Sequence, residues 1–566
     1  MSIIDWIIFV AYLALTVFIG LFKSRRGKNI EAYYLGNRSI PWWAVGLSVM
    51  ATQASAITFI GTTGQAFDDG LRFIQIYLPL PFVVIILCLT FAPFFYRARV
   101  YTAYEYLERR FDTKTRALTS FLFQCSRGMS VGIVIYAPSV VLSIMLGWNE
   151  TTTILIMGAT TLLYTALGGV RAVVWTDTMQ MILMFIGLFA GLYLVINAIP
   201  SGVTFSDAVY LGGVADRWNA IDTTINPSNQ YTLLSGLVGG FFLQLSYFGS
   251  DQSQVQRYIT ASSIKESRMS LVMTAILKVP MQFLILATGV FLFVFYQFER
   301  PPAFFNPAEI RRVEESSSSG AFHQSRQQFD AAFDHRKAMG ERLIEARRRG
   351  DPAEAERLLA DFNNADKEVK AARKKIVDII KATPGSNAND VNYVFPSFIL
   401  KYVPLGLVGL MISVIFAAAM SSISGEIAAL SSATMVDFYK RFVKPQASDI
   451  HYLRASQVCT IFWGAFATFI AMFAGRWGTS LVETVNKVGS HFYGPILGVF
   501  LLAFLVKRSN GTGAFAGAIA GLAAVLLTSY GLEISWLYLN AIGPVVVIVV
   551  GTAVSLLTRQ RLAKDE

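Results

Sequence analysis

Long apolar runs recur along almost the whole chain of 566 residues, separated by short polar segments. A helix needs about 20 predominantly apolar residues to cross the hydrocarbon core of a bilayer. By length and apolarity the pattern predicts about thirteen spans, at roughly 3–22, 41–64, 71–96, 114–147, 152–168, 173–198, 232–250, 267–297, 404–436, 454–474, 481–506, 513–530 and 534–558. We therefore expect an all-α polytopic membrane protein.

The loops between these spans differ in their content of lysine and arginine. Alternate loops are rich in basic residues, among them 97–110 and 257–268, whereas the loops between them are poor in basic residues. Basic residues beside membrane helices are retained in the cytoplasm. The pattern thus predicts an external N-terminus and a cytoplasmic C-terminus, in a multi-pass protein of the cell's inner (plasma) membrane.

One segment, 300–392, is polar and dense in charge, and it interrupts the apolar pattern. Within it, Gly350 follows a basic helix end and Asp351 precedes a proline, which are typical signals for the end of one helix and the start of the next. We predict an external helical hairpin that separates a first membrane part, 1–299, from a second, 393–566. It is either a solvated insertion without a role or a lid or partner-binding element.

The composition narrows the class of protein. Hydrophobic residues make up 54% of the chain, charged residues 15%, and the mean hydropathy is +0.49, values that do not fit a soluble domain. The net charge of +11 comes mostly from loops between spans, and no nucleic-acid motif is present. The sequence contains neither a nucleophile–base set nor a nucleotide-binding loop, so we do not expect an enzyme.

Two spans are too polar to be passive anchors. The span at 41–64 is rich in Ser, Thr and Gly, which favour local unwinding that frees backbone carbonyls to bind cations. In the ninth span, Ala418, Ser421, Ser422 and Gly425 share one helical face. Such oxygen groups suit a hard monovalent cation. The alternatives are close helix packing through small residues and serines that bond their own backbone.

Several motifs, taken together and in order, resemble the sodium:solute symporter family. They lie at 31–36, 102–111, 168–177, 251–258, 417–422 with 437–440, and 494–495. The resemblance extends over nearly the whole chain outside 300–392. It implies a LeuT-type fold of 5+5 inverted repeats, formed by spans two to six and seven to eleven. It also implies sodium-coupled import of a small organic solute by alternating access.

The resemblance further implies a sodium site. Its ligands would be the backbone carbonyls of Ala51, Ala54 and Ala418 and the hydroxyls of Ser421 and Ser422. Sodium is the only cofactor that we expect, and the transported solute and the lipid bilayer are the other partners of a chain that functions as a monomer.

A second sodium site occurs in some members of the family and would involve Asp177 and Ser424. The next residue is Gly425, where the two-sodium members have a hydroxyl, so the number of ions stays open. Asp177 could equally cap a helix or form a salt bridge. Glu426 is an unusual buried acid, which could replace the missing hydroxyl, bind substrate, or pair with Arg127 or Lys278.

The family pattern also points to residues that would contact the solute: Ser55, Thr58, Gln75, Tyr77, Arg127, Asp251 and Asn486. Arg127 could instead form a structural ion pair. The mixture of amide, acid and hydroxyl groups favours a polyhydroxylated solute, such as a sugar or a sialic acid. The alternatives are a proton-coupled carrier of a small carboxylate or vitamin, in which Asp177 or Glu426 titrates, and a transporter-like solute receptor.

Overall fold

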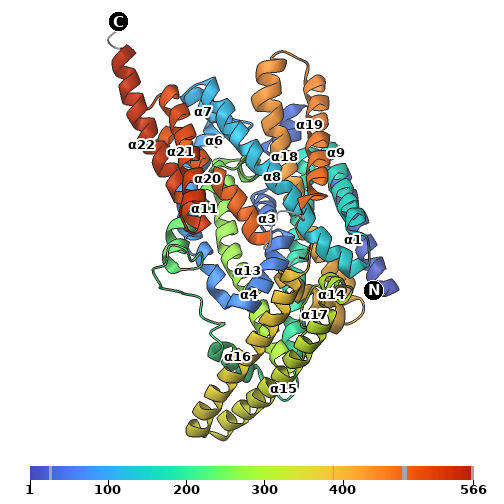
Figure 1. Ribbon diagram of the computed structural model, residues 1–566. Helices are drawn as coiled ribbons and strands as arrows, with labels where there is room; N and C mark the ends of the chain where they lie inside the picture. Colours follow the sequence, from blue (N-terminus) through green and yellow to red (C-terminus); the bar gives the residue numbers. More distant parts are fainter. Residues whose placement is uncertain (25–28, 387, 475–480, 563–566) are drawn as a thin grey trace.

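The computed structural model describes residues 1–24, 29–386, 388–474 and 481–562, and these residues form a bundle of long helices (Figure 1). Within them the only extended pairing is an isolated bridge between Ile40 and Ala261. The all-α class expected from the apolar runs is confirmed.

The first half of the bundle follows a leading helix, α1 (Ile3–Ser24), whose apolar stretch is only 28% buried and so lies at the periphery. After the short α2 (Ile30–Leu35), the chain forms α3 (Trp42–Gln53), α4 (Thr62–Asp69), η3 (Gly70–Tyr77), α5 (Leu80–Leu89), α6 (Phe91–Ala98), α7 (Ala103–Arg110), α8 (Thr113–Leu146) and α9 (Glu150–Ala198).

The span predicted at 41–64 is a broken helix. Helix α3 ends at Gln53, and Ala54 leaves the helical conformation with φ −84° and ψ 68°. The helix resumes only after Ser55, through a π-helical turn, η2 (Ile57–Gly61), that leads into α4. A break at membrane depth is tolerated only where the freed backbone groups are buried in protein or line a cavity.

Two predicted spans, 152–168 and 173–198, join in the single element α9. It bends at Gly169, which has φ 57° and ψ −160°. A Cβ there would lie 2.5 Å from the carbonyl oxygen of Tyr33, so both the conformation and the close approach require glycine.

The second half repeats the pattern of a broken first helix. After α10 (Phe205–Val214) and η4 (Ser235–Gly240), helix α11 (Phe241–Ser250) stops at Asp251, whose carboxylate accepts a 2.8 Å hydrogen bond from the N–H of Ser253 and caps α12 (Gln252–Tyr258). The remaining membrane helices are α13 (Ile264–Phe298), α18 (Leu407–Ala433) with its extension η6 (Thr434–Val443), α19 (Asp449–Ala471), α20 (Leu481–Leu505), α21 (Gly511–Gly531) and α22 (Trp536–Leu562).

Helix α18 lies at the centre of the bundle. The most apolar stretch of α18 and η6 is 89% buried, against 22% for α19, so α18 packs on protein where α19 faces the surroundings. By length and apolarity alone, ten helical segments in the described residues could cross a membrane. The broken helices are too short individually and α9 contains two spans, so the expected number of about thirteen stays a prediction.

The segment 300–392 forms the predicted hairpin. Helices α14 (Pro307–Glu314), α15 (Ser319–Arg349) and α16 (Pro352–Ala382) share a small apolar core of their own, and the chain returns to the bundle through η5 (Val391–Tyr393) and α17 (Val394–Tyr402). Gly350 ends α15 at φ 71°, and the carboxylate of Asp351 accepts from the N–H of Glu354 at 3.0 Å. The local signals therefore set the turn of the hairpin.

The hairpin is docked on α10 and on the loop between α9 and α10. Arg348 bonds the carboxylate of Asp207 and donates to the carbonyl of Gly202 at 3.0 Å, while the Arg347 guanidinium lies 4.3 Å from the ring centre of Tyr210. Burial alone would raise the pKa of Asp207, but hydrogen bonds from Thr204 and Arg348 outweigh it and hold this pKa below its usual range.

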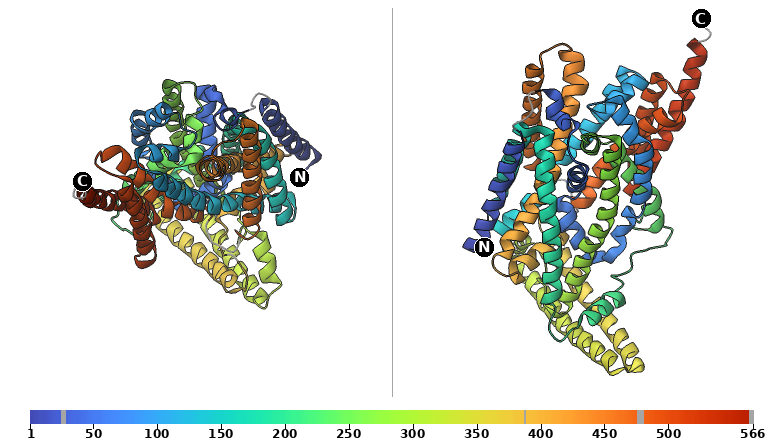
Figure 2. Two further views of the ribbon diagram at one scale, coloured as in Figure 1. Left: turned by 90° about the horizontal axis from the view of Figure 1, so that it is seen from above. Right: turned by 180° about the vertical axis from the view of Figure 1, so that it is seen from behind.

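The N-terminus and the described end of α22 lie at opposite ends of the bundle. Figure 1 and the rear view in Figure 2 place the N-terminus toward the end that carries the hairpin, and the described end of α22 at the other end. This arrangement requires an odd number of crossings between the two ends.

Candidate functional site

The serine pair of α18 meets the break in the first broken helix. The Ser421 hydroxyl donates to the carbonyl of Ala51 at 3.0 Å, and the Ser422 hydroxyl donates to the carbonyl of Thr52 at 3.1 Å. Both hydroxyls also lie near the carbonyl of Ala418, at 3.1 and 3.4 Å. Residues about 370 positions apart in the chain are thus brought within hydrogen-bond distance.

This junction has the chemistry of a monovalent cation site. It gathers neutral carbonyl and hydroxyl oxygens in a fully buried region, and Ala54, which leaves the helix beside them, is 0% exposed. Hard cations prefer such oxygen ligands, and the absence of a carboxylate among these groups suits an ion that must be released again. The residues therefore fit sodium. Sequence reasoning had not included Thr52, whose carbonyl accepts from Ser422.

Asp177 and Ser424 lie near this junction, but the positively charged side chain of Arg257 lies beside Asp177. The Ser48 hydroxyl donates to Asp177 Oδ2 at 2.6 Å, and the Nε atom of Arg257 lies 3.7 Å from the same oxygen. Both charged side chains are 0% exposed. Ser424 donates to the carbonyl of Ser421 at 3.1 Å and so bonds its own helix.

Gly425 provides the space for this arginine. A Cβ at Gly425 would lie 2.8 Å from Arg257 Nη2 and 2.9 Å from Thr52 Cγ2. The guanidinium of Arg257 thus occupies the side of α18 where a serine at position 425 would project its hydroxyl.

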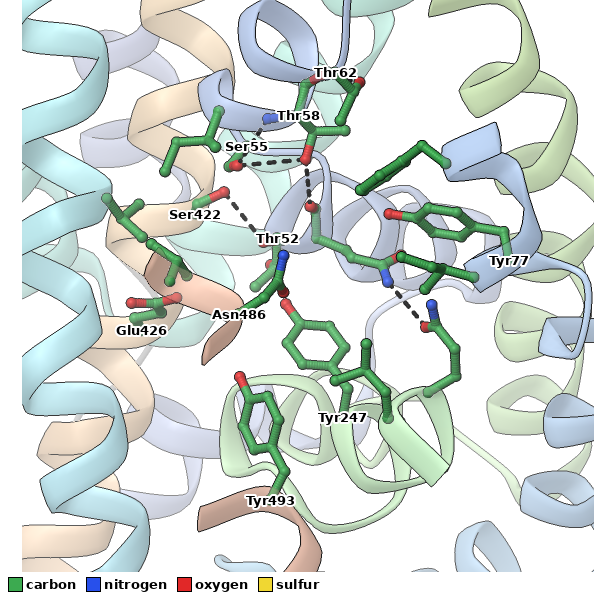
Figure 3. A pocket seen from close by; sticks show the side chains of 18 of the residues that line it. Thr52, Ser55, Thr58, Thr62, Tyr77, Tyr247, Ser422, Glu426, Asn486 and Tyr493 are labelled. Atoms are coloured by element: carbon green, nitrogen blue, oxygen red, sulfur yellow. Dashed lines mark hydrogen bonds between the residues drawn. The ribbon is translucent and has the colours of Figure 1, made fainter. Parts of the chain in front are cut away.

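A cavity of about 110 Å³ opens beside the contact between the serine pair of α18 and the broken helix, which we call the sodium junction (Figure 3). Its walls come from both broken helices and from η3, α8, α18, α20 and α22, and it is lined by Thr52, Gln53, Ser55, Ile57, Thr58, Thr62, Phe73, Ile76, Tyr77, Arg127, Val134, Leu243, Gln244, Tyr247, Ser422, Glu426, Val485, Asn486, Tyr493 and Trp536. We call it the central cavity. Its mixture of aromatic rings with amide, hydroxyl and charged groups is typical of a site for a small polar solute.

Arg127 is held between two carboxylates from different elements. Its Nε donates to Asp251 Oδ2 at 2.7 Å, and its Nη1 donates to Glu426 Oε1 at 2.8 Å. The rings of Tyr247 and Tyr493 lie 5.1 and 5.4 Å from the guanidinium carbon. The positive charge of Arg127 is thus already matched inside the protein. Of the alternatives open for Glu426, the structure shows pairing with Arg127.

The second oxygen of Glu426 remains available. Glu426 Oε2 is buried and has no hydrogen-bond partner among the described residues, and Glu426 lines the central cavity. A buried acceptor without a partner is costly, so a bound solute that donates a hydrogen bond would be favoured here. Lys278, the other candidate partner, is fully buried near the Tyr77 ring, 5.5 Å from its centre.

Most of the expected solute contacts line the central cavity, namely Ser55, Thr58, Tyr77, Arg127 and Asn486. Two others do not. Asp251 lies behind Arg127, and Gln75 is fully buried with its amide nitrogen bonded to the carbonyl of Tyr231 at 2.9 Å. Gln75 Oε1 also accepts from the N–H of Asp222 at 3.1 Å, so the structure uses Gln75 to fix the loop after α10.

Sequence reasoning missed part of the lining. Gln53 and Gln244 bond each other across the two broken helices at 3.2 Å, and Tyr247 and Tyr493 contribute rings from α11 and α20. Gln53 stands in the polar span and Gln244 in the other broken helix, so intramembrane amides were an available signal for both. The tyrosines carry no comparable signal, because aromatic residues are common in any apolar helix.

Comparison with known proteins agrees with this geometry. The profile of the sodium:solute symporter family matches residues 33–321 and 372–521, and the unmatched stretch between them lies within the hairpin. The sodium/sialic acid symporter SiaT of Proteus mirabilis is 26% identical over 97% of this chain and 94% of its own length. The sodium/glucose cotransporter of Vibrio parahaemolyticus is 26% identical over 94% and 86%.

A solved structure extends the likeness to the fold. A Na⁺-coupled sialic acid symporter, in a substrate-bound outward-open state, matches with a TM-score of 0.77 and 25% identity over 98% of each chain. The LeuT-type architecture implied by the resemblance is confirmed. With the family profile matching well over half of its residues, the chain belongs to the sodium:solute symporter family and couples sodium to the transport of a small solute.

Proposed function

We propose that this symporter imports a neutral or amino-bearing polyhydroxylated solute of the sugar class, bound in the central cavity beside one sodium ion. The sodium ligands in this proposal are the carbonyls of Ala51, Ala54 and Ala418 and the hydroxyls of Ser421 and Ser422. The observation that carries it is the meeting of the serine pair with the broken helix at the wall of a polar, aromatic cavity.

Coupling follows from Ser422, a proposed sodium ligand that also lines the central cavity, and from Thr52, whose carbonyl accepts its hydrogen bond. Ser422 and Thr52 line the central cavity, and the same two residues are joined by the 3.1 Å hydrogen bond at the sodium junction. A sodium ion that ties α3 to α18 therefore orders the wall against which the solute binds. Each ligand then favours the conformation that the other prefers, which is the thermodynamic requirement for symport.

The charges at the cavity favour solutes that donate hydrogen bonds. Arg127 already pairs with two carboxyl groups, Asp251 and Glu426, so its guanidinium is not free to meet a solute carboxylate. A carboxylate solute would have to displace one of them, and breaking a buried ion pair costs about 3–5 kcal/mol. Among the relatives, the sodium/glucose cotransporter supports a neutral sugar, whereas the sodium/sialic acid symporter SiaT supports a sialic acid. The cluster argues for neutral or amino sugars ahead of sialic acids and of the small carboxylates of the proton-coupled alternative.

A single sodium ion is supported by the position of Arg257. This guanidinium already places a fixed positive charge 3.7 Å from Asp177. A second sodium ion at Asp177 and Ser424 would meet this charge at close range in a region of low dielectric, where repulsion is strong. Arg257 thus supplies the positive charge beside Asp177 that a second sodium ion would otherwise supply.

The proposed orientation rests on the loop charges and on the arrangement of the described chain ends. The N-terminus and the hairpin share one end of the bundle, which the loop charges assign to the outside, and the described end of α22 lies at the other. We propose that the chain works as a monomer in the cell's inner (plasma) membrane.

The test is uptake into proteoliposomes that contain the purified full chain. Labelled glucose, glucosamine, N-acetylneuraminate and propionate are compared under an inward sodium gradient, and again under a pH gradient with potassium in place of sodium. We expect sodium-driven uptake of at least one neutral or amino sugar and none under the pH gradient alone. Uptake driven by protons without sodium, or transport restricted to propionate, would overturn the proposal.

A further inference from the structure

The base of the hairpin encloses a second cavity, of about 90 Å³, that shares no lining residue with the central cavity. Its walls come from α4, α13, the loop after α10, and the hairpin helices α15 and α16, which project from the lower part of the bundle in Figure 1. We call it the hairpin cavity. A buried water needs about 10–15 Å³ of cavity volume, so the hairpin cavity has room for a small molecule.

Positive charge dominates the lining of the hairpin cavity. Four basic side chains face two acidic ones, namely Arg217, Arg336, Lys370 and Arg373 against Asp68 and Asp366. The carboxylate of Asp366 serves two of the bases, at 3.2 Å from Arg336 Nη1 and 2.7 Å from Lys370 Nζ. Arg373 pairs with a carboxylate that does not line the cavity, since its Nη2 lies 3.0 Å from Asp390 Oδ1.

Two of the guanidinium groups have unused donors. Arg336 is 5% exposed, and its Nε–H has no acceptor among the described residues; the same holds for the Nε–H of Arg217. Burial lowers the pKa of both side chains, against the opposing effect of Asp68 and Asp366. A buried donor without a partner costs about 1–3 kcal/mol. An anion in the cavity would remove this cost and add a charge-assisted bond.

The rest of the lining is aromatic. The guanidinium of Arg217 lies 4.5 Å from the ring centre of Phe293, and that of Arg373 lies 5.6 Å from the ring centre of Phe305. Phe67 and Phe329 also line the cavity. Guanidinium groups beside apolar rings match a ligand that has a carboxylate at one end and a short apolar part at the other.

We propose that the hairpin cavity is a binding site for a small organic carboxylate, held by Arg217 and Arg336. The site lies where the hairpin meets the membrane bundle, because Arg336 belongs to the hairpin while Phe67 and Asp68 belong to α4. A bound anion therefore fastens the insertion to the half of the broken helix that follows the sodium junction. This gives the segment 300–392 a defined ligand and a physical connection to the transport site.

The probe is sodium propionate, titrated calorimetrically into the full-length purified chain at constant sodium and constant ionic strength in chloride. In separate titrations, phosphate is added to protein in a chloride buffer, and chloride is added to protein in a sulfate buffer. Arg217→Gln and Arg336→Gln each remove one guanidinium. Arg342→Gln is the matched control, because Arg342 is an exposed arginine on the same helix as Arg336 and does not line the cavity. Tyr247→Phe alters only the central cavity.

We expect propionate to bind the parent chain, to bind Arg217→Gln and Arg336→Gln at least tenfold more weakly, and to bind Arg342→Gln and Tyr247→Phe unchanged. If Arg336→Gln does not fold, Arg217→Gln carries the test, because Arg217 belongs to the loop after α10 and not to the hairpin. No propionate binding by the parent chain, equal binding by the guanidinium variants, or binding of phosphate or chloride without propionate would each overturn the assignment.

Discussion

The sodium junction can be tested by removing both hydroxyls of α18 together, in the variant Ser421→Ala, Ser422→Ala. Each hydroxyl donates to carbonyls near the helix break, at 3.0 to 3.4 Å. Such a neutral bond contributes about 1 kcal/mol net, and alanine suits a helix better than serine. Removing two such bonds costs about 2 kcal/mol, which the better helix propensity of alanine partly offsets, so we expect the double variant to fold with a loss of about 1–2 kcal/mol in the absence of sodium.

The effect on sodium binding should be much larger. An oxygen contact to a charged group is worth about 1.5–3 kcal/mol, so losing two of them removes about 3–6 kcal/mol. At about 1.4 kcal/mol per factor of ten, the sodium affinity should fall by roughly 10²- to 10⁴-fold. The carbonyls of Ala51, Ala54 and Ala418 remain, which places the expected loss toward the lower end of this range.

Two measurements check this expectation. The first is the sodium dependence of the thermal unfolding temperature, since a ligand at free concentration c that binds only the folded state stabilises it by RT ln(1 + c/Kd). The second is the sodium concentration for half-maximal uptake of the transported solute. Ser413→Ala is the matched control, because Ser413 is a buried serine of α18 that donates to the carbonyl of Gly409 at 2.8 Å, outside the junction. A double variant with the parental sodium dependence would refute the site.

Three further outcomes are expected. Glu426→Gln should weaken binding of amino sugars about tenfold and improve binding of carboxylate solutes, because an amide oxygen accepts more weakly than a carboxylate and Arg127 keeps only one carboxyl partner; competition with a labelled solute measures both. Gly425→Ala should lower stability by about 1–3 kcal/mol, since its Cβ would press on Arg257, which thermal unfolding reports. Because the pKa of Asp207 is held below its usual 3.8, this carboxylate should keep the hairpin docked down to about pH 4 and release it as the pH falls further, visible as faster hydrogen exchange in α10.

Each of these has a distinct contrary result. Unchanged selectivity between amino sugars and carboxylates in Glu426→Gln would mean that its unpartnered oxygen does not meet the solute. A fully stable Gly425→Ala would show that Arg257 can move aside at no cost. Loss of hairpin protection at neutral pH, or protection that Asp207→Asn leaves intact at every pH, would remove the role given to this carboxylate.

The sequence alone determined what depends on local spacing. Apolar run lengths identified the membrane class, because hydrocarbon thickness fixes the length of a spanning helix. Gly350 and Asp351 marked the turn of the hairpin, because helix ends are set by residues within one turn. The polar span at 41–64 and the serine pair at Ser421 and Ser422 pointed to a cation site, because oxygen-rich stretches in lipid need a buried partner.

Tertiary structure decided which partner each buried group meets. Arg127 joins Asp251 and Glu426 from two other helices, and Gln75 turns toward a loop instead of the central cavity. Arg257 lies against Gly425 because that residue has no side chain to exclude it. Such contacts link residues more than a hundred positions apart and depend on how helices pack, whereas hydropathy and capping patterns report only on near neighbours in the chain.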